Sequence, residues 1–347
     1  MTAMTTIAQR PLRRPPSPGE PVHVVFGRPR FSPDLPWEEI PAQWGGHLEP
    51  LASHIVIEHT GHNELGSRLL DDRSPVHVVV PTTSPVTGLM IEHGSFGLIQ
   101  QFGAGTDAID LDTAARYGVP VANMPGLNAV PVAEHAIALL LALARRLPEA
   151  RDGFRPGHWG EPSGRSLAGT TGVVIGLGAI GSEIARLLAA FGVTVIGVRR
   201  TISPGTPPPV SGMRVVDESL LHDVLGLADH VIIAASYSHG QPPVIGQAAL
   251  RAMRPGSLLI NIARGGLLDD RAALAALTTG QLGGLGLDVF PQEPYPADGP
   301  LAVHPRVVAT AHTAALTQGF FRDAAERLGE AIYRWIAGRP LDHLVVS

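Results

Sequence analysis

Three ionisable residues in the C-terminal half of the chain each follow a short apolar run. Arg264 ends the run in "INIARGG", Glu293 follows the run in "LDVFPQEP", and His312 follows the run in "ATAHTAALT". An arginine can hold a carboxylate by two bonds, and a histidine is the commonest general acid or base near neutral pH. A glutamate beside the histidine would orient its ring and favour the protonated form. Together they predict a site that binds an anion and moves a proton, although each alone could be a surface ion pair or a turn residue.

A glycine-rich turn earlier in the chain predicts a dinucleotide site. In "TTGVVIGLGAIGSEIARLLAAFGVTVIGVRR", Gly176, Gly178 and Gly181 follow a strand pattern and open an amphipathic helix pattern. The first glycine allows a tight turn, the second lets the backbone approach a pyrophosphate, and the third lets the helix pack close to the strand. The N-terminus of the helix favours phosphate groups through its N–H groups and its dipole. The alternative is an ordinary tight turn between a strand and a helix.

The second strand of this unit ends in Arg199 and Arg200, where a dinucleotide-binding unit usually carries an acid. An acid there accepts a hydrogen bond from the ribose 2′-hydroxyl and repels a 2′-phosphate. Guanidinium groups do the reverse, because they bind a phosphate through charge-assisted hydrogen bonds. The pair therefore predicts that NADP(H) is preferred. NAD(H) stays possible if both arginines are solvated loop residues.

To bring these residues together, the strands of a sheet must end at a common edge. The sequence contains two series of candidate strands. Short apolar runs alternate with helical patterns, which is typical of parallel sheets buried on both faces. The first series of expected strands covers 22–27, 54–58, 76–81, 97–102 and 119–123. The second covers 172–176, 194–198, 230–235, 257–263, 285–289 and 306–311. Helices are expected at 111–118, 132–146, 270–280 and 318–336, besides the one that the glycine-rich turn opens.

Composition bounds the class of protein. A chain of 347 residues, 44% hydrophobic and 16% charged, has material for two ordinary domains. The net charge of -5 argues against a nucleic-acid partner or an anionic membrane surface. The absence of cysteine excludes disulfides and thiolate chemistry and suits a cytoplasmic location. The Pro- and Arg-rich residues 1–20 are expected to be a disordered leader, and the longest aliphatic run, 136–144, is too short to span a bilayer.

The motifs together resemble the D-isomer-specific 2-hydroxyacid dehydrogenase family, from about Val22 onward. The segments that carry the resemblance are, in the family's order, "FGAGTDAIDLDTAARYGVPVANMPGLNAVPVAEHAIALLLALAR", "LAGTTGVVIGLGAIG", "LLINIARGGLLDDRAALAAL", "GLGLDVFPQEP" and "AHTAALT". The resemblance implies an α/β fold with a flavodoxin-like substrate domain, 21–125 plus 317–347, and a Rossmann-like NAD(P)-binding domain, 126–316. It also implies a homodimer that transfers a hydride between NAD(P)H and a small 2-oxoacid, as glyoxylate/hydroxypyruvate reductases do.

The resemblance assigns roles to individual residues. Arg264 is implied to bind and polarise the 2-oxoacid, His312 to donate the proton to its carbonyl oxygen, and Glu293 to be the histidine's partner. Asp288 is implied to receive the nicotinamide carboxamide. The main-chain N–H groups of Ala104 and Gly105 are implied to hold the substrate carboxylate. The remaining cofactor contacts are implied at Gly176, Gly178, Ala179, Ile180, Gly181, Arg199, Arg200 and Ala263.

Three further segments leave alternatives open. The loop Ser236 to Gln241 departs from the family's usual Pro and Thr pattern, so it is either a neutral variant or a reshaped pocket wall. Arg28 and Arg30 follow the first strand and could pair with a second anionic group of the substrate. Alternatively, both are solvated and the pocket takes a small neutral side chain. The stretch "EHTGHNE" lacks the helical H-E-x-x-H spacing, and we expect no metal there.

A second class of function is compatible with the same fold. A cofactor-sensing protein that regulates transcription or assembly would keep the dinucleotide turn. It would not require Arg264, Glu293 and His312 together, so the complete set favours an enzyme.

Overall fold

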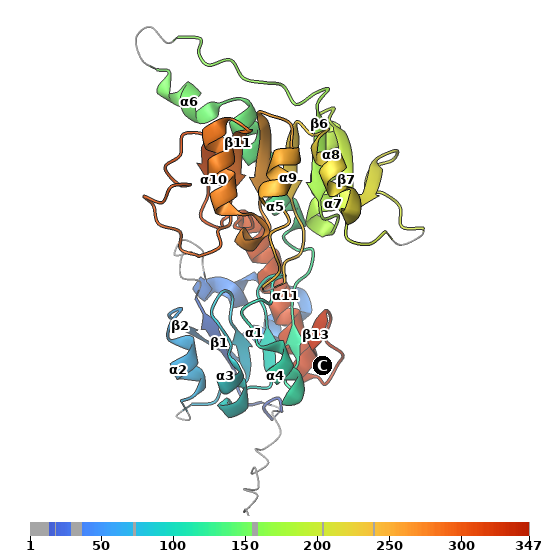
Figure 1. Cartoon of the computed structure of the whole chain (residues 1–347). Coiled ribbons are helices and arrows are strands. Elements are labelled where there is room, and N and C mark those ends of the chain that lie inside the picture. Colours follow the sequence, from blue (N-terminus) through green and yellow to red (C-terminus); the bar gives the residue numbers. More distant parts are fainter. Residues whose placement is uncertain are drawn as a thin grey trace, which may run out of the picture. The chain divides into compact units, whose positions relative to one another are not determined.

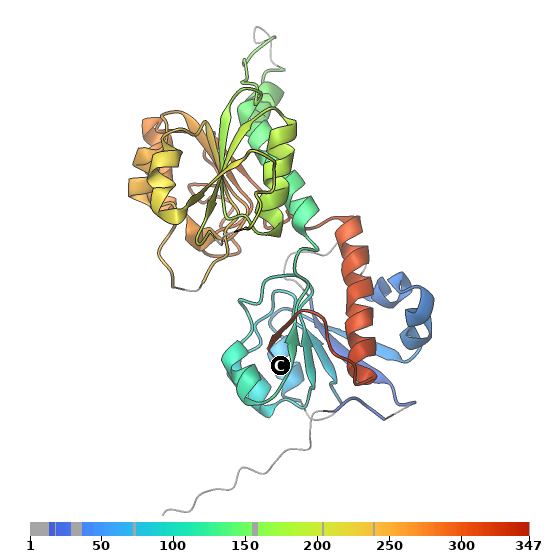
Figure 2. The ribbon, with the colours of Figure 1, turned by 90° about the vertical axis from the view of Figure 1, so that its right-hand side faces the viewer.

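The chain folds into two compact units, Met1–Leu127 with Thr317–Ser347 and Asn128–Leu316 (Figures 1 and 2). The computed structural model describes residues 14–17, 19–28, 37–71, 74–154, 159–202, 205–238 and 240–346. The expected leader over residues 1–20 lies largely outside the described residues. Both units are built on parallel sheets flanked by helices, which confirms the expected fold class.

Unit 1 contains a six-stranded sheet in the order β13-β5-β4-β3-β1-β2. Its strands are β1 (Val22–Gly27), β2 (Ile55–Thr60), β3 (Val78–Val80), β4 (Leu98–Gln100), β5 (Val121–Ala122) and β13 (Leu344–Val346). All pairs are parallel except β13 with β5, which is antiparallel. Without β13 the order 2-1-3-4-5 is that of the flavodoxin-like folds, whose ligands bind at the carboxyl ends of the strands.

Helix α11 (Gln318–Ile336) completes the core of unit 1 although it comes last in the chain. Its apolar face packs with β1, β3 and β4 and with Trp37 and Trp44. Gly329 makes room for the Trp44 ring, because a Cβ there would lie 2.7 Å from it. The other helices of unit 1 are α1 (Glu49–Ala52), α2 (Leu65–Leu69), α3 (Gly88–His93) and α4 (Leu111–Arg116), with 3-10 turns η1 (Trp37–Gln43) and η2 (Gly46–Leu48).

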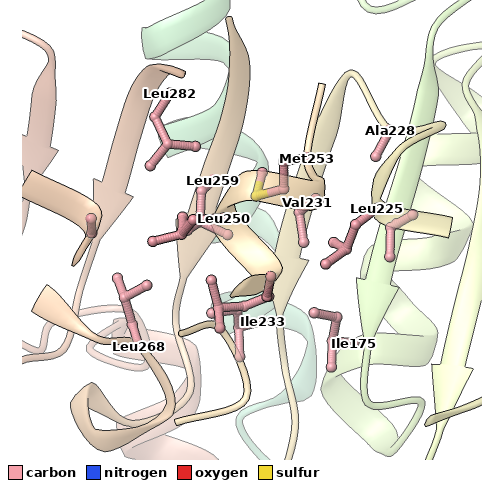
Figure 3. Packing of buried hydrophobic residues seen from close by; sticks show 14 of the residues in the cluster. Ile175, Leu225, Ala228, Val231, Ile233, Leu250, Met253, Leu259, Leu268 and Leu282 are labelled. Atoms are coloured by element: carbon pink, nitrogen blue, oxygen red, sulfur yellow. The ribbon is translucent and has the colours of Figure 1, made fainter. Parts of the chain in front are cut away.

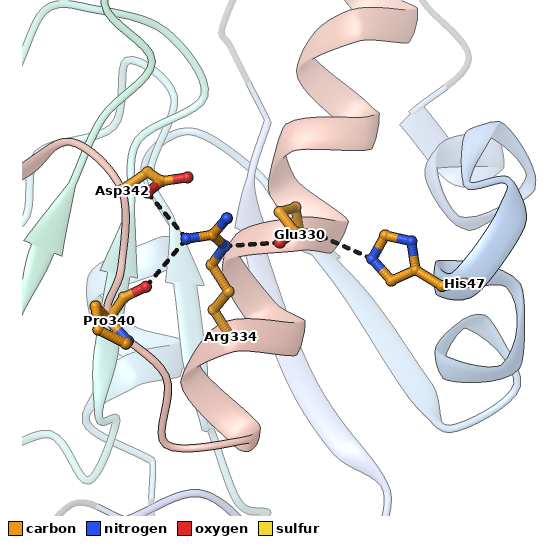
Figure 4. A network of polar contacts seen from close by, with 5 residues as sticks. All are labelled: His47, Glu330, Arg334, Pro340 and Asp342. Carbon is orange, nitrogen blue, oxygen red and sulfur yellow. Dashed lines mark hydrogen bonds and ion pairs between the residues drawn. The ribbon is translucent and has the colours of Figure 1, made fainter.

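Polar contacts fasten the other side of α11 (Figure 4). Arg334 Nε donates to Glu330 at 2.6 Å, and its Nη1 donates to Asp342 at 2.9 Å. His47, on η2, lies 3.0 Å from Glu330. These contacts tie the helix to η2 on one side and to the segment before β13 on the other.

Unit 2 contains a seven-stranded, wholly parallel sheet in the order β12-β11-β10-β9-β6-β7-β8. Its strands are β6 (Thr171–Ile175), β7 (Thr194–Arg199), β8 (Arg214–Asp217), β9 (His230–Ile233), β10 (Ser257–Asn261), β11 (Leu282–Leu287) and β12 (Val307–Ala309). The chain moves outward from β6 through β7 to β8, then returns to β9 on the other side of β6. This reversal makes the crevice at the carboxyl ends of β6 and β9 the expected ligand site.

Helices cover both faces of the unit 2 sheet. They are α5 (Ala129–Ala144), α6 (Leu147–Asp152), α7 (Ala179–Ala190), α8 (Leu221–Leu225), α9 (Gln247–Ala252) and α10 (Asp270–Thr279), with turns η3 (Glu218–Leu220) and η4 (Gly265–Leu267). Within β10, Leu259 joins the core under α8, α9 and α10 (Figure 3), whereas Leu258 and Ile260 join the core under α5 and α7. Because alternate side chains enter different cores, the strand needs an unbroken apolar sequence.

The strands expected from the sequence are all present, with ends that differ by a few residues. The structure adds β8 and β13, which the sequence interpretation did not contain. The expected helices correspond to α4, α5, α7, α10 and α11, and α10 stops at Gly280 in the left-handed region with φ +82°. In the described part of the chain, no helix is both long enough and apolar enough to cross a membrane.

Candidate active site

The turn after β6 needs glycine at two positions for steric reasons. Gly176 has φ +91°, and a Cβ on it would lie 2.5 Å from Ala235 Cα. A Cβ on Gly181 would lie 1.8 Å from the carbonyl oxygen of Gly176. Gly178, the N-cap of α7, has open space around it. The turn therefore presents bare backbone and a helix N-terminus at this edge of the sheet, which suits a pyrophosphate.

A crevice of about 700 Å³ opens beside this turn. Its lining includes Arg199, Arg200 and Glu218, so both arginines border it together with one acid. Arg200 Nε lies 3.9 Å from the Glu218 carboxylate, and both side chains are more than half exposed. The volume, the helix N-terminus and the guanidinium groups fit a dinucleotide. Sequence reasoning missed Glu218, because the strand before it, β8, was not expected.

The loop Ser236 to Gln241 follows β9 and borders the same crevice through Ser236 and Gln241. Gln241 Oε1 accepts from the Ser238 N–H at 3.0 Å, which closes the loop on itself. Tyr237 covers Gly266, where a Cβ would lie 2.8 Å from the ring. His239 lies outside the described residues.

His312 and Glu293 meet because they follow the neighbouring strands β12 and β11. His312 Nδ1 lies 2.7 Å from Glu293 Oε2, and Glu293 Oε1 accepts from the Phe290 N–H at 2.9 Å. With Nδ1 held by the carboxylate, Nε2 is the ring nitrogen left for a substrate. The His312 side chain is 46% exposed, so a ligand can reach it.

Electrostatics favour a charged pair. The hydrogen bond with Glu293 raises the pKa of His312 above its ordinary value, against the opposing effects of burial and of Arg264. Burial by itself would raise the pKa of Glu293, but the hydrogen bond and charge of His312 hold it below its ordinary value. The pair is therefore biased towards imidazolium and carboxylate, the state that can deliver a proton.

Asp288 brackets the loop that carries His312. Its side chain is buried, with 1% exposed, and it accepts from Thr310 Oγ1 at 2.6 Å, Thr313 N at 2.8 Å and Ala314 N at 3.1 Å. The Asp288 carbonyl oxygen also accepts from the His312 N–H at 2.8 Å. His312 has φ +55°, a left-handed conformation that few residues adopt unless their surroundings impose it. The bracket supplies that constraint.

Arg264 is placed by a buried asparagine at the end of β10. Asn261 is fully buried; its Oδ1 accepts from Ala263 N at 3.1 Å and its Nδ2 donates to Arg264 O at 3.0 Å. Gly265 then passes so close to the next loop that a Cβ would lie 2.0 Å from the Phe290 carbonyl carbon. Sequence reasoning missed Asn261, although a lone amide in the apolar run "SLLINIA" was a signal, since a buried amide needs partners.

A family profile described as "D-isomer specific 2-hydroxyacid dehydrogenase, NAD binding domain" matches residues 137–314. This chain belongs to that family. The match spans the turn, the crevice and the loops of Arg264, Glu293 and His312, and it confirms the resemblance of the sequence motifs.

The similar proteins differ in substrate. D-3-phosphoglycerate dehydrogenase from Bacillus subtilis is 33% identical over 301 residues, which are 85% of this chain and 55% of that protein. The chain thus spans about half the length of the curated relatives it matches. A structure from Thermus thermophilus has a TM-score of 0.79 at 27% identity, covering 94% of this chain and 100% of that one. NADPH-dependent glyoxylate/hydroxypyruvate reductase from Sinorhizobium meliloti, in complex with NADP and malonate, has a TM-score of 0.76 at 26% identity, covering 94% and 97%.

In unit 1 of this family member, the loop with Ala104 and Gly105 is held by its carbonyl groups. Asn123 Nδ2 donates to Ala104 O at 2.7 Å, and Gln101 Nε2 donates to Gly105 O at 2.6 Å. Within the described residues, neither loop N–H donates to a protein acceptor. The loop therefore offers two N–H groups for a ligand.

Arg28 and two residues of the segment "EHTGHNE" make contacts within unit 1. Arg28 forms an ion pair with Glu38, and Arg30 lies outside the described residues. In the segment "EHTGHNE", Glu58 accepts from Arg68 at 2.7 Å and His62 lies 3.3 Å from Ser84 Oγ. Among the residues that the structure describes, no group of three His, Cys, Asp or Glu side chains could hold a metal ion.

Proposed function

We propose that this chain is an NAD(P)H-dependent oxidoreductase that interconverts a small 2-oxoacid and the corresponding 2-hydroxyacid. The observation that carries the proposal is the 2.7 Å contact between His312 and Glu293, in the same unit as the dinucleotide crevice. The test is to follow absorbance of the reduced nicotinamide with a panel of 2-oxoacids and both cofactors. Tight binding of NADPH without turnover of any 2-oxoacid would instead favour a cofactor-sensing protein.

Each residue has a separate task in the proposed reaction. When bound, the nicotinamide supplies the hydride. Arg264 binds the substrate carboxylate and polarises the carbonyl, and protonated His312 gives its Nε2 proton to the carbonyl oxygen. Arg264 and His312 both stabilise the charge that develops on that oxygen. In the oxidative direction, neutral His312 takes the proton from the hydroxyl, and Glu293 holds the ring in both directions.

The remaining assignments are also proposals. Ala104 and Gly105 offer their N–H groups to the substrate carboxylate, which their tied carbonyl groups support. Ala179, Ile180 and the three turn glycines face the pyrophosphate, and Ala263 borders the nicotinamide. Asp288 receives the carboxamide in addition to its loop contacts, since a carboxylate has about four acceptor positions. A cytosolic location is proposed as well, supported by a sequence without cysteine.

The first prediction is that NADPH is preferred over NADH by about tenfold, since a hydrogen bond to a charged group contributes about 1.5–3 kcal/mol. Arg199→Asp should reverse the preference. Glu218 shares the crevice with Arg200, and its negative charge repels a 2′-phosphate. Glu218→Gln should therefore increase the affinity for NADPH and leave that for NADH unchanged. Asp223→Asn, an exposed acid on α8 outside the crevice lining, is the control.

The measurements are the dissociation constant of each cofactor by nucleotide fluorescence and kcat/KM at one ionic strength. Equal or better kcat/KM with NADH in the wild type would remove the arginines from cofactor selection.

The second prediction concerns the substrate side chain. We propose a small uncharged one, as in glyoxylate or hydroxypyruvate, because Glu38 already compensates Arg28. The name of the Bacillus subtilis relative points to the alternative, a substrate with a phosphate. Steady-state kinetics should compare glyoxylate, pyruvate and hydroxypyruvate with 2-oxoglutarate and 3-phosphohydroxypyruvate. We expect the uncharged group to have the higher kcat/KM, and Arg28→Ala to leave the ranking unchanged. A leading phosphorylated substrate whose KM alone rises in Arg28→Ala would reverse this assignment.

The third prediction is that the protein is a homodimer joined through unit 2. Phe154 and Trp159 are 81% and 86% exposed, and their rings pack edge to face at 5.9 Å. Contiguous exposed apolar patches mark interaction sites, and we propose that this pair of rings belongs to one. Light scattering after gel filtration should give a dimer for wild type and a monomer for Trp159→Ser. Leu89→Ser, an exposed apolar residue of unit 1, should stay dimeric. A monomeric wild type, or a dimeric Trp159→Ser, contradicts the proposal.

A further inference from the structure

A line of polar side chains connects helix α5 with the loop that carries His312. His135, in the first half of α5, has Nε2 2.9 Å from Thr310 Oγ1. Thr310 Oγ1 in turn lies 2.6 Å from Asp288 Oδ1, and His135 Nε2 lies 3.6 Å from the same carboxylate oxygen. The His135 side chain is 22% exposed and that of Asp288 1%, so the line is largely shielded from water.

The direction of these hydrogen bonds follows from the groups involved. A threonine hydroxyl has one proton and accepts further hydrogen bonds through its lone pairs. Both other neighbours of Thr310 Oγ1 are acceptors, the Asp288 carboxylate at 2.6 Å and the Leu287 carbonyl oxygen at 3.4 Å. Thr310 therefore donates to one of them and accepts from His135. His135 must carry a proton on Nε2 for this arrangement to hold.

At the other end of this line, Asp288 contacts residues on both sides of His312. Asp288 holds Thr310 on one side of His312 and the N–H groups of Thr313 and Ala314 on the other. His312 stands between them with φ +55°. A residue in that conformation keeps it only while its surroundings impose it, and the contacts of Asp288 constrain the backbone that carries the imidazole.

We propose that His135 is a positioning residue for His312. Its Nε2–H orients the Thr310 hydroxyl towards Asp288, and the carboxylate so fixed holds the loop that directs His312 at Glu293. The kinetic part of this inference rests on the proposed function, whereas the structural part does not. His135 gives no proton to the substrate.

Losing the His135 hydrogen bond should change the titration of His312. The charged groups that act on the His312 ring are Glu293, Asp288 and Arg264. A looser loop populates the 2.7 Å contact with Glu293 less often, and that contact favours the protonated ring. The pKa of His312 should therefore fall towards its ordinary value. The alkaline decline of 2-oxoacid reduction should move to lower pH in parallel.

The experiment compares His135→Leu, which removes the donor, with His135→Gln, which keeps an N–H group. Thr310→Val and Thr310→Ser make the same comparison at the acceptor. Nuclear magnetic resonance of isotopically labelled histidine, in the full chain without substrate or cofactor, reports the His312 titration, and the signal is assigned by its absence in His312→Gln. Glu134→Gln, an exposed neighbour on α5, is the control.

We expect His135→Leu to lower the His312 pKa and to reduce kcat about tenfold, the effect of one lost hydrogen bond. His135→Gln and Thr310→Ser should keep most of the wild-type His312 pKa and most of the wild-type kcat. The double variant His135→Leu/Thr310→Val should be no worse than Thr310→Val alone, because residues acting through one contact are not additive.

An unchanged His312 titration in His135→Leu overturns the inference, as does a double variant whose effects add. If His135→Leu fails to fold, His135→Gln and the two Thr310 variants still test the positioning role. That role requires His312 to titrate differently in Thr310→Val and in Thr310→Ser. Absence of turnover in the wild type would count against the proposed function, and the resonance titration would still test the positioning role.

Discussion

His312→Gln should lower kcat by about 10²–10⁴-fold, the contribution of a positioned general acid, and leave cofactor binding intact. Glutamine can still hydrogen-bond to the substrate oxygen but cannot transfer a proton to it. The dinucleotide crevice lies beside the turn after β6 and has no His312 in its lining, so the cofactor dissociation constant should not move. Near-normal turnover in this variant would remove His312 from the mechanism.

The wild-type pH dependence follows from the same residue. The hydrogen bond with Glu293 raises the pKa of His312, so the ring stays protonated to a higher pH than a free histidine does. Reduction needs the protonated ring and should weaken as pH rises through that raised pKa. Oxidation needs the neutral ring and should strengthen over the same range. In Glu293→Gln, the decline of reduction and the rise of oxidation should both move to lower pH. If neither moves, Glu293 does not set the pKa of His312.

Gly181→Ala and Gly178→Ala should fail in different ways, although they lie three positions apart in one turn. A Cβ at Gly181 would lie 1.8 Å from the Gly176 carbonyl oxygen, so α7 must move away from β6. We expect loss of at least about 4 kcal/mol in the free energy of unfolding, the range of severe backbone and packing disruptions, together with loss of cofactor binding. Denaturant unfolding and fluorescence titration with NADPH measure the two effects.

Gly178→Ala is the matched variant. Its Cβ would meet nothing within 4 Å, and its φ of -73° suits any residue. Unfolding should therefore be unchanged within about 0.5–1 kcal/mol, the helix-terminus effect of a capping glycine. Cofactor affinity should still fall, because the added methyl group stands where the backbone has to approach a pyrophosphate. Unaltered NADPH affinity in this variant would mean that the pyrophosphate lies elsewhere.

The fold was predictable because burial on two faces leaves a simple pattern. The alternate side chains of β10 enter two cores, so its sequence is an unbroken apolar run that local inspection can find. Strand β8 was not predicted, because it is a four-residue edge strand that starts with Arg214 and ends with Asp217. Strand β13 was not predicted, because its three residues form a strand only when β5 is beside them.

The candidate site was predictable where residues follow strand ends, and not where distant contacts decide their role. Arg264, Glu293 and His312 follow adjacent strands, and strand order brings their loops together. His135 and Thr310 are 175 positions apart, and nothing in the local sequence of either indicates a partner. Glu218 and Arg200 meet only because β8 lies beside β7. Similarly, the sequence offered Arg28 as a partner for an anionic group of the substrate, but the structure pairs it with Glu38.

The order of the two units along the chain has a consequence for protein synthesis. Strands β1 to β5 leave the ribosome first, yet the helix that covers one face of their sheet, α11, is separated from them by the whole of Asn128–Leu316. Unit 2 is continuous and can fold as soon as it emerges, because domains fold as units during translation. The first half of unit 1 must wait with Val24, Phe26 and Val80 uncovered until α11 arrives. Ribosome-bound intermediates that stop before Thr317 should therefore bind chaperones and apolar dyes through unit 1, and released chains that include α11 should not.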